Sequence, residues 1–253
     1  MMKKFVLIVA ALAAAFYMIF SIAGFGGFDE ICKGLSIAAL IYGVSRTLAK
    51  AVMFGDKGAL FTGALGLGIL AVGGLYALAS LHVMRMEDIN LTVEDFSDAC
   101  SYLFFLAAIS LLLTPYVERK KMFLTGMNTL YVVMMLMITY SVVVNNRVLL
   151  CVTSMATAFL CIIFSGYLLR LSWIEKELRA ARFFACSMIS LGILDMIIYP
   201  LFLLETSLRL YHIFSALYVP LFIWISEGLL LLSGFATDNV DQKMSCSQPQ
   251  NHK

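Results

Sequence analysis

The chain has 253 residues, of which 62% are hydrophobic and only 13% are charged. An average soluble domain is about 45–50% apolar and about 25% charged, and a soluble monomer of this size cannot hide so much apolar surface from water. The composition therefore excludes a soluble globular enzyme, a disordered chain, a disulfide-stapled secreted domain and a nucleic-acid-binding protein, while the net charge of +2 gains meaning only once the charges are placed along the chain.

The apolar residues fall into eight runs, each near the 20 or so residues that a helix needs to cross the hydrocarbon core of a membrane. The runs are apolar on every side, so helices are expected in place of barrel strands. The sequence predicts an all-α fold: a polytopic bundle of eight transmembrane helices in one domain, residues 1–236, with a polar cytoplasmic tail, residues 237–253. The predicted spans are 5–25, 33–54, 59–83, 99–117, 122–144, 148–171, 183–204 and 211–235.

The first run follows Lys3 and Lys4, as the apolar segment of a signal peptide would. Its apolar stretch reaches Phe20 and no clear small-residue cleavage site follows, which favours an uncleaved first helix. Cleavage would leave seven helices and move the N-terminus outside.

Basic residues orient the bundle, because cytoplasmic loops carry an excess of Lys and Arg. With the N-terminus inside, 14 of the 18 basic residues lie at cytoplasmic helix ends or in the tail. The sequence therefore predicts a multi-pass protein of the cell inner (plasma) membrane with both termini in the cytoplasm. The four basic residues expected outside are Lys33, Arg85, Arg147 and Arg209.

Two connections between the predicted helices have a clear character. The external loop Arg85–Asp98 is acidic and is expected to be solvated. The internal connection Ser172–Arg182 contains WIEKELRAAR and is expected to be a short amphipathic helical extension at the membrane surface. The tail from Thr237 is too short to hold a catalytic or DNA-binding output module.

Asp195 and Glu227 are the acidic residues that fall within the predicted spans, and an ionisable residue at membrane depth is a functional candidate by default. Their depths differ by roughly 8 Å at about 1.5 Å per residue, so no direct contact between them is expected. Arg46 and Lys50 lie near the depth of Glu227, on one face of the second helix. Either cation forms an ion pair with Glu227, or both snorkel to the inner surface.

Asp195 is a candidate ligand-binding, proton-carrying or catalytic residue, or else it forms a structural hydrogen bond to Ser or Tyr of a neighbouring helix. Pro200 and Pro220 are expected to kink the seventh and eighth helices and to free carbonyls that line a cavity between them. Polar side chains there are candidate ligand-binding groups, although such residues more often join helices. Beside Asp195 and Glu227 these are Tyr199, Tyr218 and Ser226, with Ser187, Ser190 and Ser215 as further polar groups.

The third predicted helix is rich in glycine. Small residues recur four apart at Ala59/Gly63, Ala64/Gly68 and Gly73/Ala77, a spacing that lets helix backbones approach closely. We expect this helix to pack centrally. A phosphate-binding role is disfavoured because no strand–loop–helix context surrounds the glycines.

No cofactor and no metal site are expected. His82 and His212 lie at outer helix ends, His252 lies in the tail, and no C-x-x-C motif occurs. A disulfide between Cys32 and Cys100 is one interpretation in an oxidising compartment, and free thiols buried in the membrane are the other.

A loose hydrophobic pattern extends from Gly66 to about Leu232. The segments GLGILAVGGLYAL and VEDFSDACSYLFFLAAISLLL, together with LDMIIYP in the seventh span, resemble the eight-helix membrane sensor region of some bacterial diguanylate cyclases. The resemblance implies a membrane sensor. Gly74 stands where that pattern has Asp, and no signalling output domain follows, so a cyclase activity is not implied.

The chain is also distantly similar to the lysoplasmalogenase-like YhhN family of stand-alone eight-helix proteins. Asp195 matches the acid in the seventh helix of that family, with Leu194 in place of Ser before it. Gly73 and Gly74 replace the Gly-Asp of the third helix, so one acid of the family pattern is missing. The similarity implies a membrane lipid hydrolase, and both patterns imply a four-plus-four helix arrangement.

The leading hypothesis is a membrane-embedded sensor or binding module for a small apolar or amphipathic ligand or a membrane partner. The alternatives are a membrane lipid hydrolase with Asp195 as general acid/base, and a small transporter with Asp195 or Glu227 as the proton-coupling carboxylate. Expected partners are membrane lipids, a small amphipathic ligand and a membrane signalling partner, with no nucleic acid. Convergent catalytic groups would indicate the hydrolase, and polar groups reaching both faces would indicate the transporter.

Overall fold

The structure is a computed structural model, and it describes residues 28–54, 58–79, 93–203 and 217–232. These ranges contain helices and no strand. The predicted first span, 5–25, and the tail, 237–253, lie outside the described residues. The α-helices are α2 (Phe28–Phe54), α3 (Ala59–Ala79), α4 (Val93–Leu113), α5 (Lys120–Val143), α6 (Arg147–Ile174), α7 (Ala181–Leu203) and α9 (Tyr218–Leu232), and short 3-10 helices follow α4 at Thr114–Tyr116 (η2) and precede α7 at Lys176–Ala180 (η3).

The all-helical membrane fold expected from the composition is confirmed. Six of the described helices, α2 to α7, are long and apolar enough to cross a membrane. The seventh, α9, is apolar but has 15 residues, or about 22 Å at 1.5 Å per residue, which is shorter than a full hydrocarbon core. Seven of the eight predicted spans therefore coincide with described helices.

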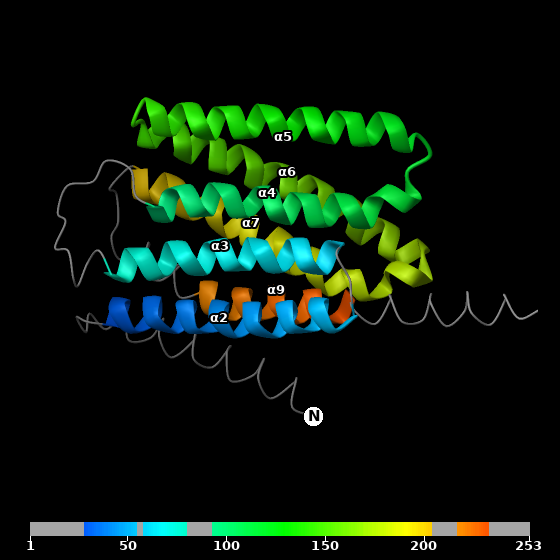
Figure 1. The fold of residues 1–253 in the computed structure, drawn as a ribbon, viewed down its shortest axis with the longest axis horizontal. Coiled ribbons are helices and arrows are strands. Elements are labelled where there is room, and N and C mark those ends of the chain that lie inside the picture. The colour runs from blue at the N-terminus through cyan, green and yellow to red at the C-terminus, as the bar shows by residue number, and fades with distance from the viewer. Residues whose placement is uncertain (1–27, 55–57, 80–92, 204–216, 233–253) are drawn as a thin grey trace, which may run out of the picture.

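From α2 to α7, helices that follow one another along the chain run in alternating directions (Figure 1). α7 and α9 are antiparallel, because Asp195 contacts Tyr218 near one end of the pair while Phe184 contacts Gly228 near the other. Contacts of Gly43 with Ser226 and of Lys50 with Leu230 make α2 and α9 parallel. One end of the bundle, here named the Arg147 end, holds the starts of α4, α6 and α9. The opposite end, where α5 starts, is named the Arg119 end.

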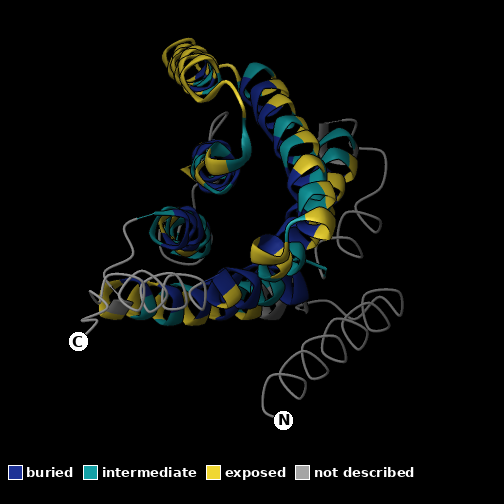
Figure 2. Ribbon diagram, turned by 90° about the vertical axis from the view of Figure 1, so that its right-hand side faces the viewer, coloured by how far each residue is buried: buried dark blue, intermediate teal, exposed yellow. Residues whose placement is uncertain are grey.

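The core lies where α4, α7 and α9 meet their neighbours. Phe105, Ile109, Phe184 and Met188 are fully buried, as is Ile225 of α9. Helices that are apolar on every side suit this position because they present no polar face to hide. By contrast α5, at the top of Figures 1 and 2, is mostly exposed and apolar, which suits contact with lipid chains.

Glycines set the closest helix approaches. A Cβ built on Gly63 would meet the side chain of Leu229 at 2.5 Å, and one on Gly228 would meet the Phe184 backbone at 2.7 Å. The expected close packing of α3 is therefore present at Gly63, while at Gly68 the nearest atom, in Val44, is 4.0 Å away. Small residues bring α9 against both α3 and α7.

One sequence-based expectation about a helix kink is corrected. Pro220 was expected in the middle of the last span, but α9 begins at Tyr218 and places Pro220 in its first turn. A proline there loses no helical hydrogen bond, since the first N–H groups of a helix have no partner within it, so this proline marks a helix start. Pro200 does lie inside α7. The connection Ser172–Arg182, in contrast, is helical as expected, because α6 continues to Ile174 and η3 follows at Lys176–Ala180.

Candidate functional site

Asp195 lies in the interior of the bundle with 5% of its surface exposed. Its Oδ2 atom accepts a hydrogen bond from the hydroxyl of Tyr102 on α4, and its Oδ1 atom accepts one from the hydroxyl of Tyr218 on α9. One carboxyl group thus joins three helices that are distant in sequence. We name these three residues the Asp195 cluster.

Ring packing holds the two hydroxyls in place. Tyr102 is 1% exposed and meets Phe105 edge-on, with ring centroids 6.4 Å apart. Tyr218 stacks on Phe222 one turn further along α9, with centroids 5.5 Å apart and an interplanar angle of 18°. Each tyrosine therefore contributes an apolar body to the core and a polar tip to the carboxyl group.

The hydrogen bonds offset the cost of burying Asp195. A carboxyl group taken out of water without partners is unfavourable by several kcal/mol. Each of the two hydroxyl donors contributes about 1 kcal/mol to folding stability as an ordinary hydrogen bond, and more when the carboxyl group is ionised. The cluster is therefore a satisfied polar site, which matches the sequence-based alternative of a bond from Asp195 to Tyr on a neighbouring helix.

A second acid–tyrosine contact lies one helical turn nearer the Arg147 end. The hydroxyl of Tyr199 on α7 donates to Oδ2 of Asp98 on α4 at 3.5 Å, a long hydrogen bond. Tyr199 was expected to line the cavity beside Asp195, and the structure places it in this contact. Still nearer the end, Arg147 Nε of α6 lies 3.3 Å from Oδ2 of Asp95.

The four residues form a reciprocal pair of contacts. Asp98 and Tyr102 are four apart on α4, and Asp195 and Tyr199 are four apart on α7. The Asp of each helix bonds the Tyr of the other, as antiparallel helices in register require. Sequence reasoning missed Asp98 and Tyr102, although the D-x-x-x-Y spacing that occurs in both helices was a signal that could have found them.

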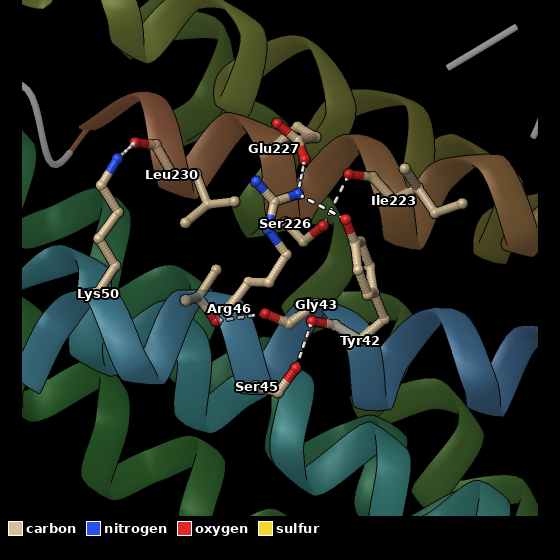
Figure 3. A network of polar contacts seen from close by, with 10 residues as sticks. Tyr42, Gly43, Ser45, Arg46, Lys50, Ile223, Ser226, Glu227 and Leu230 are labelled. Atoms are coloured by element: carbon tan, nitrogen blue, oxygen red, sulfur yellow. Dashed lines mark hydrogen bonds and ion pairs between the residues drawn. The ribbon is translucent and has the colours of Figure 1, made fainter. Parts of the chain in front are cut away.

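Glu227 occupies a different site, between α2 and α9 (Figure 3). Its Oε1 atom pairs with Nη1 of Arg46, which also donates to the Tyr42 hydroxyl at 3.0 Å. Lys50 donates to the backbone carbonyl of Leu230 at 3.1 Å. Of the two ion pairs considered from the sequence, the structure thus shows the one with Arg46. The Glu227 side chain is 5% exposed, and its Oε2 atom has no hydrogen-bond partner among the described residues.

Ser226 faces α2 beside this ion pair and not the Asp195 cluster. Its hydroxyl donates to the carbonyl of Ile223 at 2.8 Å, and its Cβ lies 2.8 Å from where a Cβ of Gly43 would be. Ser187 and Ser190 likewise donate to carbonyls of their own helix. Ser187 is buried and Ser190 is exposed, and neither contacts Asp195, whereas Ser215 lies outside the described residues.

The two buried acids lie in separate sites, as their predicted depths required. Tyr218, which bonds Asp195, and Glu227 are nine residues apart on α9, or about 13 Å along the helix axis. Phe222 and Ile225 fill part of this interval and are buried. One polar site therefore lies toward the Arg147 end and the other toward the Arg119 end, with apolar side chains between them.

Metal-binding groups do not gather in the part of the chain that the structure describes: no three His, Cys, Asp or Glu side chains there could hold one ion. Cys100, Cys151 and Cys161 are free and buried. The disulfide between Cys32 and Cys100 that the sequence left open is therefore absent. Buried thiols of this kind behave as small apolar side chains.

The chain matches no known family model, no curated protein and no solved structure. Function must therefore be argued from the two polar sites themselves. Of these, the Asp195 cluster joins the larger number of helices and is the more deeply buried.

Proposed function

We propose that this protein is an eight-helix membrane module that binds and senses a small apolar or amphipathic ligand at Asp195. The observation that carries the proposal is the single carboxyl group held between hydroxyls of α4 and α9. A ligand that brings its own hydrogen-bond donor or positive charge competes with Tyr102 or Tyr218 for this carboxyl group. Its binding then changes the contacts among three helices, which is the differential interaction that a sensor needs.

The helix directions support a location in the inner (plasma) membrane with both termini in the cytoplasm. The described helices alternate, so that α2, α4, α6 and α9 run one way and α3, α5 and α7 run the other. With the first span that the sequence predicts at 5–25, the number of crossings is even, which puts both termini on one side of the membrane. The Arg119 end carries the basic run of Arg119, Lys120 and Lys121, as a cytoplasmic end should.

Ligand binding is tested with purified protein in detergent and a panel of fatty acids, lysophospholipids and alkyl amines. At least one class is expected to raise the unfolding temperature of the wild-type protein, because a ligand that binds only the folded state stabilises it. Asp195→Asn keeps the size of the side chain and is expected to abolish the shift while the protein still inserts and folds. Glu118→Gln, at an exposed acid, is the matched control and is expected to keep it.

Two results would contradict the proposal. One is an unchanged ligand-induced shift in Asp195→Asn. The other is an Asp195→Leu variant that is at least as stable as the wild-type protein and responds fully to the same ligands.

A proton-coupled transporter is the second candidate, and Glu227 favours it. Its Oε2 atom is buried and lacks a hydrogen-bond partner among the described residues, and its site lies on the opposite side of the bundle's apolar middle from Asp195. Polar groups toward both ends are what a transport path needs. Proton-driven uptake of the stabilising ligand by vesicles, abolished in Glu227→Gln, would favour this function over sensing alone. The lipid hydrolase is less favoured, because both oxygens of Asp195 are engaged by tyrosine hydroxyls.

A further inference from the structure

We propose that the two acid–tyrosine contacts between α4 and α7 form a proton route from the Arg147 end of the bundle to Asp195. The route consists of Asp98, Tyr199 and then the Asp195 cluster. It goes beyond the proposed binding function, because protons exchange with Asp195 along it whether or not a ligand binds.

The register of the two helices supports a route and not two unrelated contacts. Asp98 and Tyr102 follow one face of α4, and Asp195 and Tyr199 follow one face of α7. Because the helices are antiparallel, the two faces interleave an acid and a hydroxyl at each successive turn. Carboxyl and hydroxyl groups both donate and accept protons, so each neighbour in this series can pass one to the next.

The route opens toward the Arg147 end. Asp98 and Tyr199 are half-buried, whereas Asp195 is 5% exposed. Asp95 lies one turn nearer the start of α4 and pairs with Arg147 at 3.3 Å. An acidic entrance next to a partly exposed ion pair supplies a group that water can protonate.

The route is closed toward the Arg119 end. Below the Asp195 cluster, Leu191 and Met188 of α7 and Phe222 and Ile225 of α9 are all buried. These side chains offer no group that carries a proton. Asp195 therefore exchanges protons with one end of the bundle, and the Arg46–Glu227 pair belongs to the other end.

The groups that face Asp195 come from each helix packed around it. They are Tyr102 and Asp98 of α4, Tyr199 of α7 itself and Tyr218 of α9. From α6, Cys161 Sγ contacts the carbonyl of Tyr102 at 3.5 Å, and Cys151 interacts with Asp95 and Asp98.

Each transfer conserves protons. A hydronium ion protonates Asp98 and becomes water, and the Tyr199 hydroxyl turns its hydrogen from Asp98 toward the cluster. Asp98 then gives its proton to the Tyr199 oxygen, and Tyr199 releases its original hydroxyl proton, which Asp195 gains. One O–H bond breaks for each that forms, and the net result is one proton gained by Asp195. Among the described residues no hydrogen bond joins Tyr199 to the Asp195 cluster, so the proposed route includes one bridging water at this last step.

The test measures how fast Asp195 gains a proton. The full chain in detergent is subjected to a rapid drop in pH, and the carbonyl stretch of protonated carboxyl groups is followed by time-resolved infrared spectroscopy. The component lost in Asp195→Asn belongs to Asp195. Tyr199→Phe removes only the hydroxyl and is expected to slow this component at least about tenfold, and Asp98→Asn is expected to do the same.

The matched control is Tyr116→Phe. Tyr116 lies in η2, directly after α4 at the Arg119 end, and its hydroxyl donates to Glu177 at 2.9 Å. The substitution removes a tyrosine hydroxyl that also bonds an acid but lies far from the route. In Tyr116→Phe, Asp195 is expected to gain its proton at the same rate as in the wild-type protein. If Tyr199→Phe fails to fold, as judged by gel filtration, Asp98→Asn carries the same expectation.

The route is refuted if Asp195 gains its proton at the wild-type rate in both Tyr199→Phe and Asp98→Asn, or if Tyr116→Phe slows it equally. An Asp195 component that never appears on acidification refutes it as well. Ligand-induced stabilisation is measured at equilibrium and does not depend on this rate, so the two proposals fail separately.

Discussion

At the scale of single residues, the two buried acids differ in the groups that bond them. Asp195 is held by two neutral hydroxyl donors, and Glu227 by one cation. A carboxyl group bonded only to hydroxyls can gain a proton without leaving a cation unpaired. The Glu227 carboxylate has Arg46 as its charge partner, so removing either residue leaves a charge uncompensated.

Removing one partner of the Arg46–Glu227 pair is expected to destabilise the protein. Arg46→Met should lower the free energy of unfolding by about 2–3 kcal/mol, less than for a fully buried pair because the Arg46 side chain is 36% exposed. Arg46→Met combined with Glu227→Met should recover most of the loss, since no charge is then left buried. Denaturant unfolding in detergent measures both. Arg119→Met, at an exposed arginine, is the control, and equal stability of Arg46→Met and Arg119→Met would contradict the expectation.

At the scale of helices, close approach is decided by a few glycines. Gly228 lets α9 lie directly against the backbone of α7 at Phe184, and this contact lies on the same helix pair as the bond from Tyr218 to Asp195. The spacing of the two helices therefore controls whether that hydroxyl reaches the carboxyl group. Helix packing and the geometry of the polar site are linked through this interface.

Gly228→Ala is expected to destabilise the bundle by about 1–3 kcal/mol, as overpacking of a tight contact does. The added Cβ would lie 2.7 Å from the Cα atom of Phe184, and a backbone cannot move aside as a flexible side chain can. Gly126→Ala, on exposed α5 with no atom within 4 Å, is expected to be neutral or to stabilise by up to about 1 kcal/mol through helix propensity. Thermal unfolding compares the two. A Gly228→Ala protein as stable as Gly126→Ala would show that α7 and α9 do not pack at this distance.

At the scale of the whole molecule, polar chemistry is divided between the two ends. The acid–tyrosine contacts lie toward the Arg147 end, and the Arg46–Glu227 pair lies toward the Arg119 end. Around them, α5 and other exposed apolar surfaces face outward. This arrangement assigns the two sites to opposite leaflets in the proposed topology.

Single-cysteine labelling tests that topology in intact cells. Val144→Cys, in the turn before α6, is expected to react with a membrane-impermeant maleimide added outside. Lys121→Cys, at the start of α5, is expected to react only after the membrane is permeabilised. Both variants are made in a background in which all six native cysteines are replaced by alanine, so that only the introduced thiol can react. The reverse pattern would place the Arg119 end outside and overturn the predicted orientation.

The sequence by itself determined the membrane class, the helical fold and the approximate position of seven described helices, because the length and uniform apolarity of each run are local properties that depend on no partner helix. It also singled out Asp195 and Glu227, since a charge in an apolar run is conspicuous wherever the run packs. The depth argument that separated the two acids and put Arg46 level with Glu227 needed only the rise of a helix.

Only the tertiary structure decided which side chains meet. The D-x-x-x-Y spacing around Tyr102 and Asp195 is visible in the sequence, but it does not say that the two helices lie side by side or that Tyr102 bonds a residue 93 positions away. The start of α9 at Tyr218, which places Pro220 in a first turn, is likewise a feature that the apolar run did not mark. Helix–helix contacts depend on rotation, register and spacing, and these follow from the combined fit of all neighbouring helices, which no single run of sequence contains.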